Sequence, residues 1–158
     1  AILREEGADL EEAEWLARRT WGSPGRARQF REQGLPQANR QLVEKLLHLT
    51  PRDNFQVAEW VRDTADERAE SSAERRQALQ ELLECVAVFY RDAAISAMGY
   101  DGEVFNEAYR DQLEQYAAQH DLDTILEAAD LTLNALEEIG ANANQRLALV
   151  NLFTQLAG

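Results

Sequence analysis

Cysteine and histidine are scarce in this sequence. Among 158 residues there is one cysteine, Cys85, and there are two histidines, His48 and His120. One cysteine excludes a disulfide within the chain and is typical of reducing compartments, which favours the cytoplasm. The histidines are too far apart for a recognisable metal motif, and neither stands at a spacing that would make Cys85 a nucleophile. We therefore expect no catalytic residue, no metal site and no cofactor, and we interpret Cys85 as a buried core thiol.

Long apolar runs are also absent. The run VAVFY at 86–90 is far too short to cross a bilayer, and no signal segment opens the sequence, so we expect no membrane contact. The sequence begins AILREEG without an initiator methionine. We interpret this stretch as the tail of a helix in a longer protein. With 45% apolar residues, the chain is long enough for one large domain or two small ones.

Negative charge dominates, but only beyond residue 47. Residues 1–47 hold eight basic and eight acidic side chains, whereas residues 48–158 hold eight basic and 21 acidic ones. An acidic surface repels phosphate backbones, so we expect no direct nucleic-acid binding by the second part. Five arginines cluster between residues 18 and 31. A solvated helix face explains such a cluster, and a phosphate or partner contact is the alternative.

The apolar residues follow a helical period throughout, which predicts an all-α fold. Capping residues and apolar stripes predict helices over about 9–20, from 24 to near 34, through 42–47, from 51 onward, over 72–98, through 105–116, over 122–140, and after a cap at Asn142. The pairs Leu35-Pro36 and Thr50-Pro51 bracket the point where the charge shifts. We predict a small helical bundle over 1–48 and a larger helical bundle over 49–158.

The segment TWGSPGRARQF at 20–30 poses the main chemical question, because its glycines, serine and arginines could cradle a phosphate. It lacks the GxxxxGK[ST] motif, and a helix precedes it where a P-loop requires a strand. We interpret Gly22 as a helix C-terminal cap and Ser23-Pro24 as the next helix start, whose free N–H groups could still meet an anion.

Two further groups of residues have simpler explanations than ligand binding. His120 and Asp121 resemble metal ligands, but Asp121 is better explained as the N-cap of the following helix. The tryptophans, Trp15, Trp21 and Trp60, lie in or beside predicted helices. We interpret them as packing residues, with a ligand-stacking role as the alternative.

Three segments resemble known proteins. AEWLARRTWGSPGRARQF at 13–30 is similar to the lid of clamp-loader subunits of bacterial DNA polymerase III, and GSPGRA resembles the delta prime version of that lid. The ATP-binding gamma/tau version instead carries Met-Arg-Asp after Gly-Ser. FYRDAAISAMG at 89–99 resembles the arginine–aspartate segment of the delta prime collar helix. NALEEIGANANQRLALVNLFTQLAG at 134–158 resembles the closing helix of that collar.

The resemblance covers nearly the whole chain, and it implies a lid over 1–48 and a collar over 49–158. It implies a scaffold that joins gamma/tau and delta subunits in a five-subunit clamp loader, which loads the sliding clamp during DNA replication. The matching positions suggest subunit-interface residues: Arg91, Asp92, Asn142, Asn144, Arg146 and Leu147.

The resemblance also implies that the turn Gly22, Ser23, Pro24, Gly25 and Arg26 is a vestigial nucleotide sensor. Gly25 stands where the gamma/tau lid has an arginine that reaches the nucleotide phosphates. Arg26 is displaced by one residue, or about 100 degrees around a helix, so it is expected to point elsewhere. Two alternatives stay open: the same region of an ATP-hydrolysing gamma/tau-like subunit, and a helical adaptor unrelated to replication.

Overall fold

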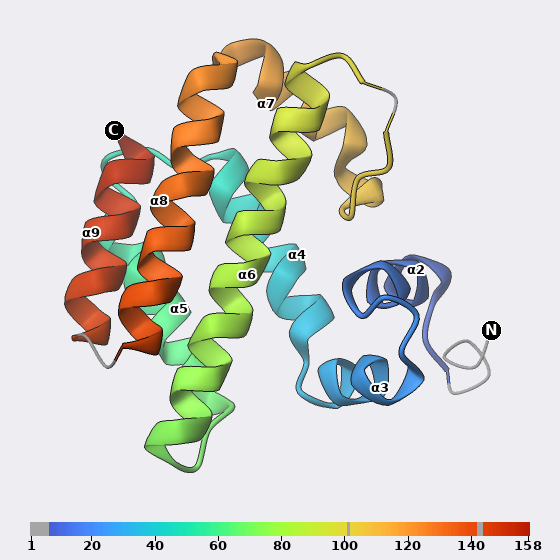
Figure 1. Ribbon diagram of the computed structural model, residues 1–158, viewed down its shortest axis with the longest axis vertical. Coiled ribbons are helices and arrows are strands. Elements are labelled where there is room, and N and C mark those ends of the chain that lie inside the picture. Colours follow the sequence, from blue (N-terminus) through green and yellow to red (C-terminus); the bar gives the residue numbers. More distant parts are fainter. Residues whose placement is uncertain (1–6, 101, 142–143) are drawn as a thin grey trace.

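The structure, a computed structural model, describes residues 7–100, 102–141 and 144–158, and within these ranges all regular structure is helical (Figure 1). The all-α prediction is therefore confirmed. The elements are α2 (Leu10–Arg19), α3 (Pro24–Glu32), α4 (Leu35–Leu47), α5 (Asn54–Glu67), α6 (Ser72–Ala97), the 3₁₀ turn η1 (Glu107–Tyr109), α7 (Arg110–Gln119), α8 (Leu122–Gly140) and α9 (Gln145–Ala157).

Local capping determines most of the helix starts, as the sequence predicted. The side chains of Asp9, Ser23, Ser71 and Asp121 each accept a hydrogen bond from the backbone N–H three residues further along. This bond satisfies one of the free donors of a helical first turn. At the end of α6, Gly99 adopts φ +65, as a glycine terminator does. The long helix predicted over 72–98 is thus confirmed to within one residue.

Three predicted helix starts are wrong. The helix expected from Pro51 begins at Asn54, because the Asp53 carboxylate folds back to accept hydrogen bonds from the Thr50 N–H and hydroxyl at 3.2 and 2.7 Å. The helix expected from Phe105 begins only with η1. The last helix is capped by Asn144, whose Oδ1 accepts from the Leu147 N–H at 3.0 Å. The predicted cap, Asn142, and the opening residues 1–6 lie outside the described residues.

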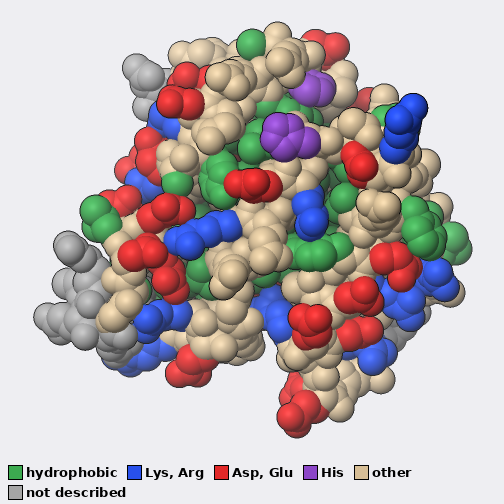
Figure 2. Space-filling view, turned by 180° about the vertical axis from the view of Figure 1, so that it is seen from behind, with side chains coloured by type: hydrophobic (Ala, Val, Ile, Leu, Met, Phe, Trp, Pro, Cys, Tyr) green, Lys and Arg blue, Asp and Glu red, His purple; other side chains and the backbone are tan. Residues whose placement is uncertain are grey.

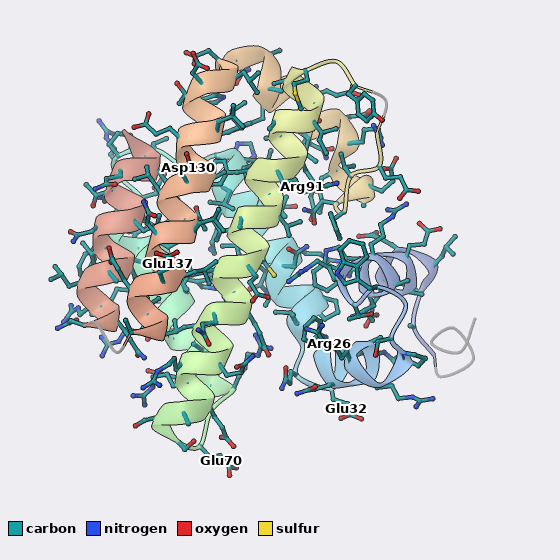
Figure 3. All side chains as sticks on the ribbon, viewed as in Figure 1. Arg26, Glu32, Glu70, Arg91, Asp130 and Glu137 are labelled. Carbon is teal, nitrogen blue, oxygen red and sulfur yellow. The ribbon has the colours of Figure 1, made fainter. Side chains whose placement is uncertain are left out.

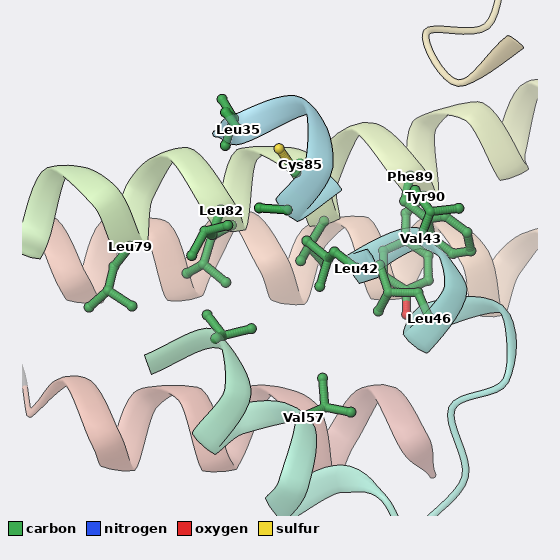
Figure 4. Close-up of a cluster of buried hydrophobic side chains, with 14 of the residues drawn as sticks. Leu35, Leu42, Val43, Leu46, Val57, Leu79, Leu82, Cys85, Phe89 and Tyr90 are labelled. Carbon is green, nitrogen blue, oxygen red and sulfur yellow. The ribbon is translucent and has the colours of Figure 1, made fainter. Parts of the chain in front are cut away.

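Helices α2 and α3 lie to one side of a larger bundle built from α5 to α9, and α4 packs between the two groups (Figure 1). In that bundle α6 and α8 run side by side, and α9 packs on α5 and α8. Leu42, Val43 and Leu46 of α4 are buried in one cluster with Phe89 and Tyr90 of α6 (Figure 4). Because α4 buries residues against both groups, a domain boundary at residue 48 stays a prediction.

One ion pair joins the end of α5 to α6, and a second joins α2 to α6. Arg68 Nη2 lies 3.3 Å from Glu81 Oε2, and both side chains are almost buried. The same nitrogen donates to Gln33 at the end of α3, at 3.4 Å. Arg19 of α2 lies 3.7 Å from Glu84 on α6. The Gln33–Arg68 hydrogen bond and the Arg19–Glu84 ion pair thus link α3 and α2 to the larger bundle.

Candidate functional site

The turn between α2 and α3 is a Schellman motif, shifted by one residue from the prediction. The Gly22 N–H donates to the Ala17 carbonyl at 2.9 Å, and the Trp21 N–H donates to the Arg18 carbonyl at 3.4 Å. Trp21, with φ 53, therefore occupies the left-handed position that glycine usually fills. The prediction that Gly22 takes this position is wrong, although Gly22 also has positive φ.

Trp21 is the most exposed large apolar side chain in the described part of the chain, at 86%. Its interpretation as a packing residue is therefore wrong, whereas Trp15 is buried, and Trp60 is partly buried beside the Lys45 ammonium. A left-handed conformation costs a non-glycine residue about 1–2 kcal/mol. A positive φ is uncommon for so bulky a residue, and burial does not account for it at this exposed position.

We expect Trp21→Gly to raise the free energy of unfolding by about 1 kcal/mol, because glycine adopts the left-handed conformation without a steric cost. Urea denaturation followed by circular dichroism measures this change. Trp21→Ala is the matched control and should leave stability nearly unchanged, because alanine keeps the strained φ. Equal stability of the glycine and alanine variants would show that position 21 stores no strain.

The start of α3 shows where the residues of the predicted sensor turn lie. Ser23 Oγ accepts the Arg26 N–H at 3.4 Å, so the serine caps the helix. Apart from its chain neighbours and the backbone of its own helix, nothing lies within 4 Å of the position that a Cβ would take at Gly25. The guanidinium of Arg26 (labelled in Figure 3) lies 5.5 Å from the centre of the Phe30 ring, which is one turn along the same helix. The side chain thus packs along its own helix.

Asp92, an expected interface residue, has its carboxylate at the centre of an internal network. Its Oδ1 accepts the Phe105 N–H at 3.0 Å, and its Oδ2 accepts both the backbone N–H and the side-chain amide of Asn106 at 2.9 Å. The side chain is fully buried, so Asp92 is not available to a partner in this structure. These bonds hold residues 105–106 in a non-helical conformation, which explains why the helix predicted from Phe105 starts later.

Burial and the neighbouring polar groups shift the pKa of the Asp92 carboxyl group in opposite directions. Burial raises the pKa of the carboxyl group, while the hydrogen bonds from Asn106 and Phe105 and the nearby Arg91 lower it. The Arg91 guanidinium lies partly exposed beside the carboxylate, with Nη1 3.0 Å from Oδ1. It also stacks over the Phe105 ring at 4.7 Å. Arg91 (labelled in Figure 3) therefore covers the network from outside and still offers a cation at the surface.

Among the interface residues predicted around the start of α9, those within the described ranges lie at the surface. Arg146 Nε lies 3.2 Å from Glu59 Oε1, and its guanidinium lies 5.8 Å from the centre of the Phe55 ring. Leu147 is 58% exposed and Phe55 is 50% exposed. We call Phe55, Arg146 and Leu147 the α5–α9 corner. Asn144 is exposed but is already engaged as the cap of α9.

The sequence reasoning missed a second exposed apolar feature, on α8. Leu126 and Leu133 stand seven residues apart, which places them on one face of the helix, and both remain about half exposed. Asp130 and Glu137 continue the same face (Figure 3). We call these four residues the α8 ridge. Helical periodicity shows that both leucines lie in the helix over 122–140, but it does not show that they stay exposed.

The remaining candidate residues have structural roles. Cys85 is fully buried, and burial raises the pKa of its thiol, as expected for a core cysteine. Asp121 caps α8, and the His120 ring stacks on Tyr116 with 4.0 Å between ring centres. Within the described ranges, no group of three histidine, cysteine or acidic residues could hold a metal ion. Nor does any described helix combine the length and apolar character that a membrane span needs.

Acidic and basic side chains are interspersed over the back face of the molecule, with small apolar areas between them (Figure 2). Comparison of the chain with protein-family models, with curated proteins and with solved structures gives no match. The function must therefore be inferred from the sequence segments and from the exposed side chains described above.

Proposed function

We propose that this chain is the lid and collar region of a delta prime-like clamp-loader subunit, which acts as a scaffold for the pentameric complex that loads the sliding clamp in DNA replication. Its partners in this proposal are gamma/tau and delta subunits, and the sliding clamp and primed DNA are contacted only through them. The three sequence segments that resemble delta prime subunits support it. They lie in a small helical group and on the long helices of a larger bundle.

The observation that carries the proposal is the exposed apolar surface of the larger bundle. The α8 ridge and the α5–α9 corner expose Leu126, Leu133, Leu147 and Phe55 next to charged side chains. Apolar side chains surrounded by charges are typical of protein–protein interfaces with a polar rim. The same part of the chain is strongly acidic: residues 110–158 hold two basic and eight acidic side chains. This charge favours a protein partner over DNA.

The experiment that tests the proposal is binding of purified gamma/tau and delta C-terminal regions to the immobilised chain, measured by biolayer interferometry. We expect Kd values at or below the micromolar range, because standard interfaces reach this range. An unrelated helical bundle of similar net charge is the control. Absence of binding to either partner would favour the alternative of a helical adaptor outside replication.

The turn at Gly22–Arg26 leads to a second expectation, which concerns nucleotide binding. Gly25 places no side chain near the start of α3, and Arg26 packs along its own helix. We therefore propose that this turn has lost nucleotide sensing, and we expect no measurable binding of ATP to the chain. Calorimetry would detect it: an affinity of about 1 mM or tighter would favour the gamma/tau-like alternative.

A further inference from the structure

The outer face of α8 carries an apolar strip. The helix packs on α6 and α9 with its inner face, while Leu126 and Leu133 of the α8 ridge stay 45% and 51% exposed. At about 100° per residue, three further apolar residues follow on one side of these leucines. They are partly buried against the core, namely Leu122, Ala129 and Leu136. The strip therefore continues from the core of the bundle onto its surface.

All the charged side chains of α8 lie on the other side of the two leucines. They are five exposed carboxylates, of Asp123, Glu127, Asp130, Glu137 and Glu138. With about 100° between successive residues, all five fall within about 120° of Leu126 in the same direction of rotation. Figure 3 labels Asp130 and Glu137 on this helix. The outer face is thus divided lengthwise into an apolar strip and an acidic strip.

No cation of the described chain balances the acidic strip. Helix α8 carries no lysine or arginine, whereas each of the other described α-helices carries at least one. Among the described residues, none of the five carboxylates takes part in an ion pair. On the neighbouring helix α5, in contrast, Glu59 is paired with Arg146 at 3.2 Å.

The charge pattern also opposes the stability of α8 itself. Glu137 and Glu138 lie in its last turn, where the helix dipole favours cations, and no basic residue stands there. Asp123 and Glu127 are four residues apart, a spacing at which like charges on a helix repel each other. A cationic segment along this face would relieve both unfavourable interactions. The acidic strip therefore complements a basic partner.

We propose that the α8 ridge binds a basic amphipathic helix of a partner protein. The apolar side of that helix covers Leu126 and Leu133, and its lysines and arginines lie over the acidic strip. Leucines seven residues apart match the spacing of the anchors that a helix presents to another helix. A helix also satisfies its own backbone hydrogen bonds, whereas an extended segment would find no free backbone partners on α8. The inference rests on the proposed function in treating the ridge as an interface, and it adds the chemistry of the partner.

Other occupants fit this face less well. The phosphates of a nucleic acid and the headgroups of an anionic membrane would meet the five carboxylates, which repel them. A second copy of α8 would place like charges opposite each other, which disfavours a symmetric pairing of this face. A protein helix with basic residues avoids both conflicts.

The test measures binding of a fluorescein-labelled peptide to the chain by fluorescence anisotropy. The peptide consists of two copies of the heptad Lys-Leu-Lys-Ala-Leu-Ala-Lys, which places leucines on one face of a helix and lysines on both sides of them. We expect a Kd of about 10–100 μM at about 50 mM salt, and about tenfold weaker binding at about 500 mM salt. In ¹⁵N-labelled chain, the amide signals that shift on binding should belong to α8.

Two matched peptides separate apolar contact from charge. Replacing every leucine of the peptide by glutamine keeps its charge and removes its apolar face, and it should weaken binding at least about tenfold. Replacing every lysine by glutamate keeps the apolar face and places like charges against the acidic strip. This second peptide should show no measurable binding.

Two double variants of the chain test the position of the site. Asp130→Asn with Glu137→Gln removes two carboxylates from the ridge and should weaken binding of the lysine peptide about three- to tenfold. Glu32→Gln with Glu70→Gln removes the same charge from exposed positions on α3 and between α5 and α6 (labelled in Figure 3). This control should change the affinity by less than about twofold. A thermal midpoint at or above that of the unmodified chain would confirm that each variant is folded.

Three outcomes would overturn the proposal. They are no saturable binding of the lysine–leucine peptide at about 1 mM, equal binding of the glutamine-substituted peptide, and equal losses in the two double variants. The last two would indicate charge attraction without a specific site. These results differ from a failure of the proposed function. Binding of gamma/tau and delta regions without binding of the lysine peptide would contradict only the partner chemistry, and the reverse result would contradict only the clamp-loader assignment.

Discussion

Asp92→Ala is expected to lower the free energy of unfolding by about 3 kcal/mol, because it leaves three buried or partly buried donors without an acceptor. These donors are the N–H of Phe105 and the N–H and side-chain amide of Asn106. For a chain of this size, the thermal midpoint should fall by roughly 6–12 °C. Urea denaturation and calorimetry measure the two quantities.

Asp130→Ala is the matched control for this substitution, since Asp130 is an exposed aspartate on a helix of the same bundle (Figure 3). It should change stability by no more than about 0.5 kcal/mol. Asp92→Asn preserves size but turns one acceptor into a donor that faces the Asn106 N–H groups, so it should also destabilise the chain. If Asp92→Ala costs less than about 1 kcal/mol, the segment before α7 is held by other contacts.

The second large effect is expected at the α8 ridge, from the double variant Leu126→Glu and Leu133→Glu. Both leucines are about half exposed, so folding should tolerate the change. If the ridge is buried by a partner, two desolvated carboxylates oppose binding, and we expect at least about a hundredfold loss of affinity for gamma/tau or delta regions. Biolayer interferometry with the immobilised variant measures the loss.

The control for the double variant changes two other exposed apolar residues to glutamate, Met98 and Tyr100, which follow α6. It adds the same charge away from the ridge and should reduce affinity much less. Equal losses in both double variants would show that net charge, and not the ridge, governs binding.

A feature of this fold can be predicted from the sequence when the residues that form it lie close together along the chain. The start of α6 and the start of α8 follow from Ser71 and Asp121, which bond to the N–H three residues away. Such pairs are visible in any short window of sequence. The position of Trp21 was predicted less well, because the left-handed position of the turn could fall on residue 21 or on Gly22.

Features that depend on contacts between distant segments could not be predicted. Asp92 binds residues 13 and 14 positions later, and the Asn39–Asn106 bond joins positions 67 apart. Helical periodicity marks Asp92 only as a polar residue in a long helix, and it gives no sign of the residues that bind its carboxylate. The exposure of the α8 leucines likewise depends on which faces α6 and α9 cover.

The most direct test of the scaffold role is the molar mass, by light scattering, of this chain mixed with gamma/tau and delta collar regions at micromolar concentration. The account predicts a hetero-oligomer of defined mass that contains this chain, and its loss with the Leu126→Glu and Leu133→Glu variant. A chain that stays monomeric with every partner would contradict the account.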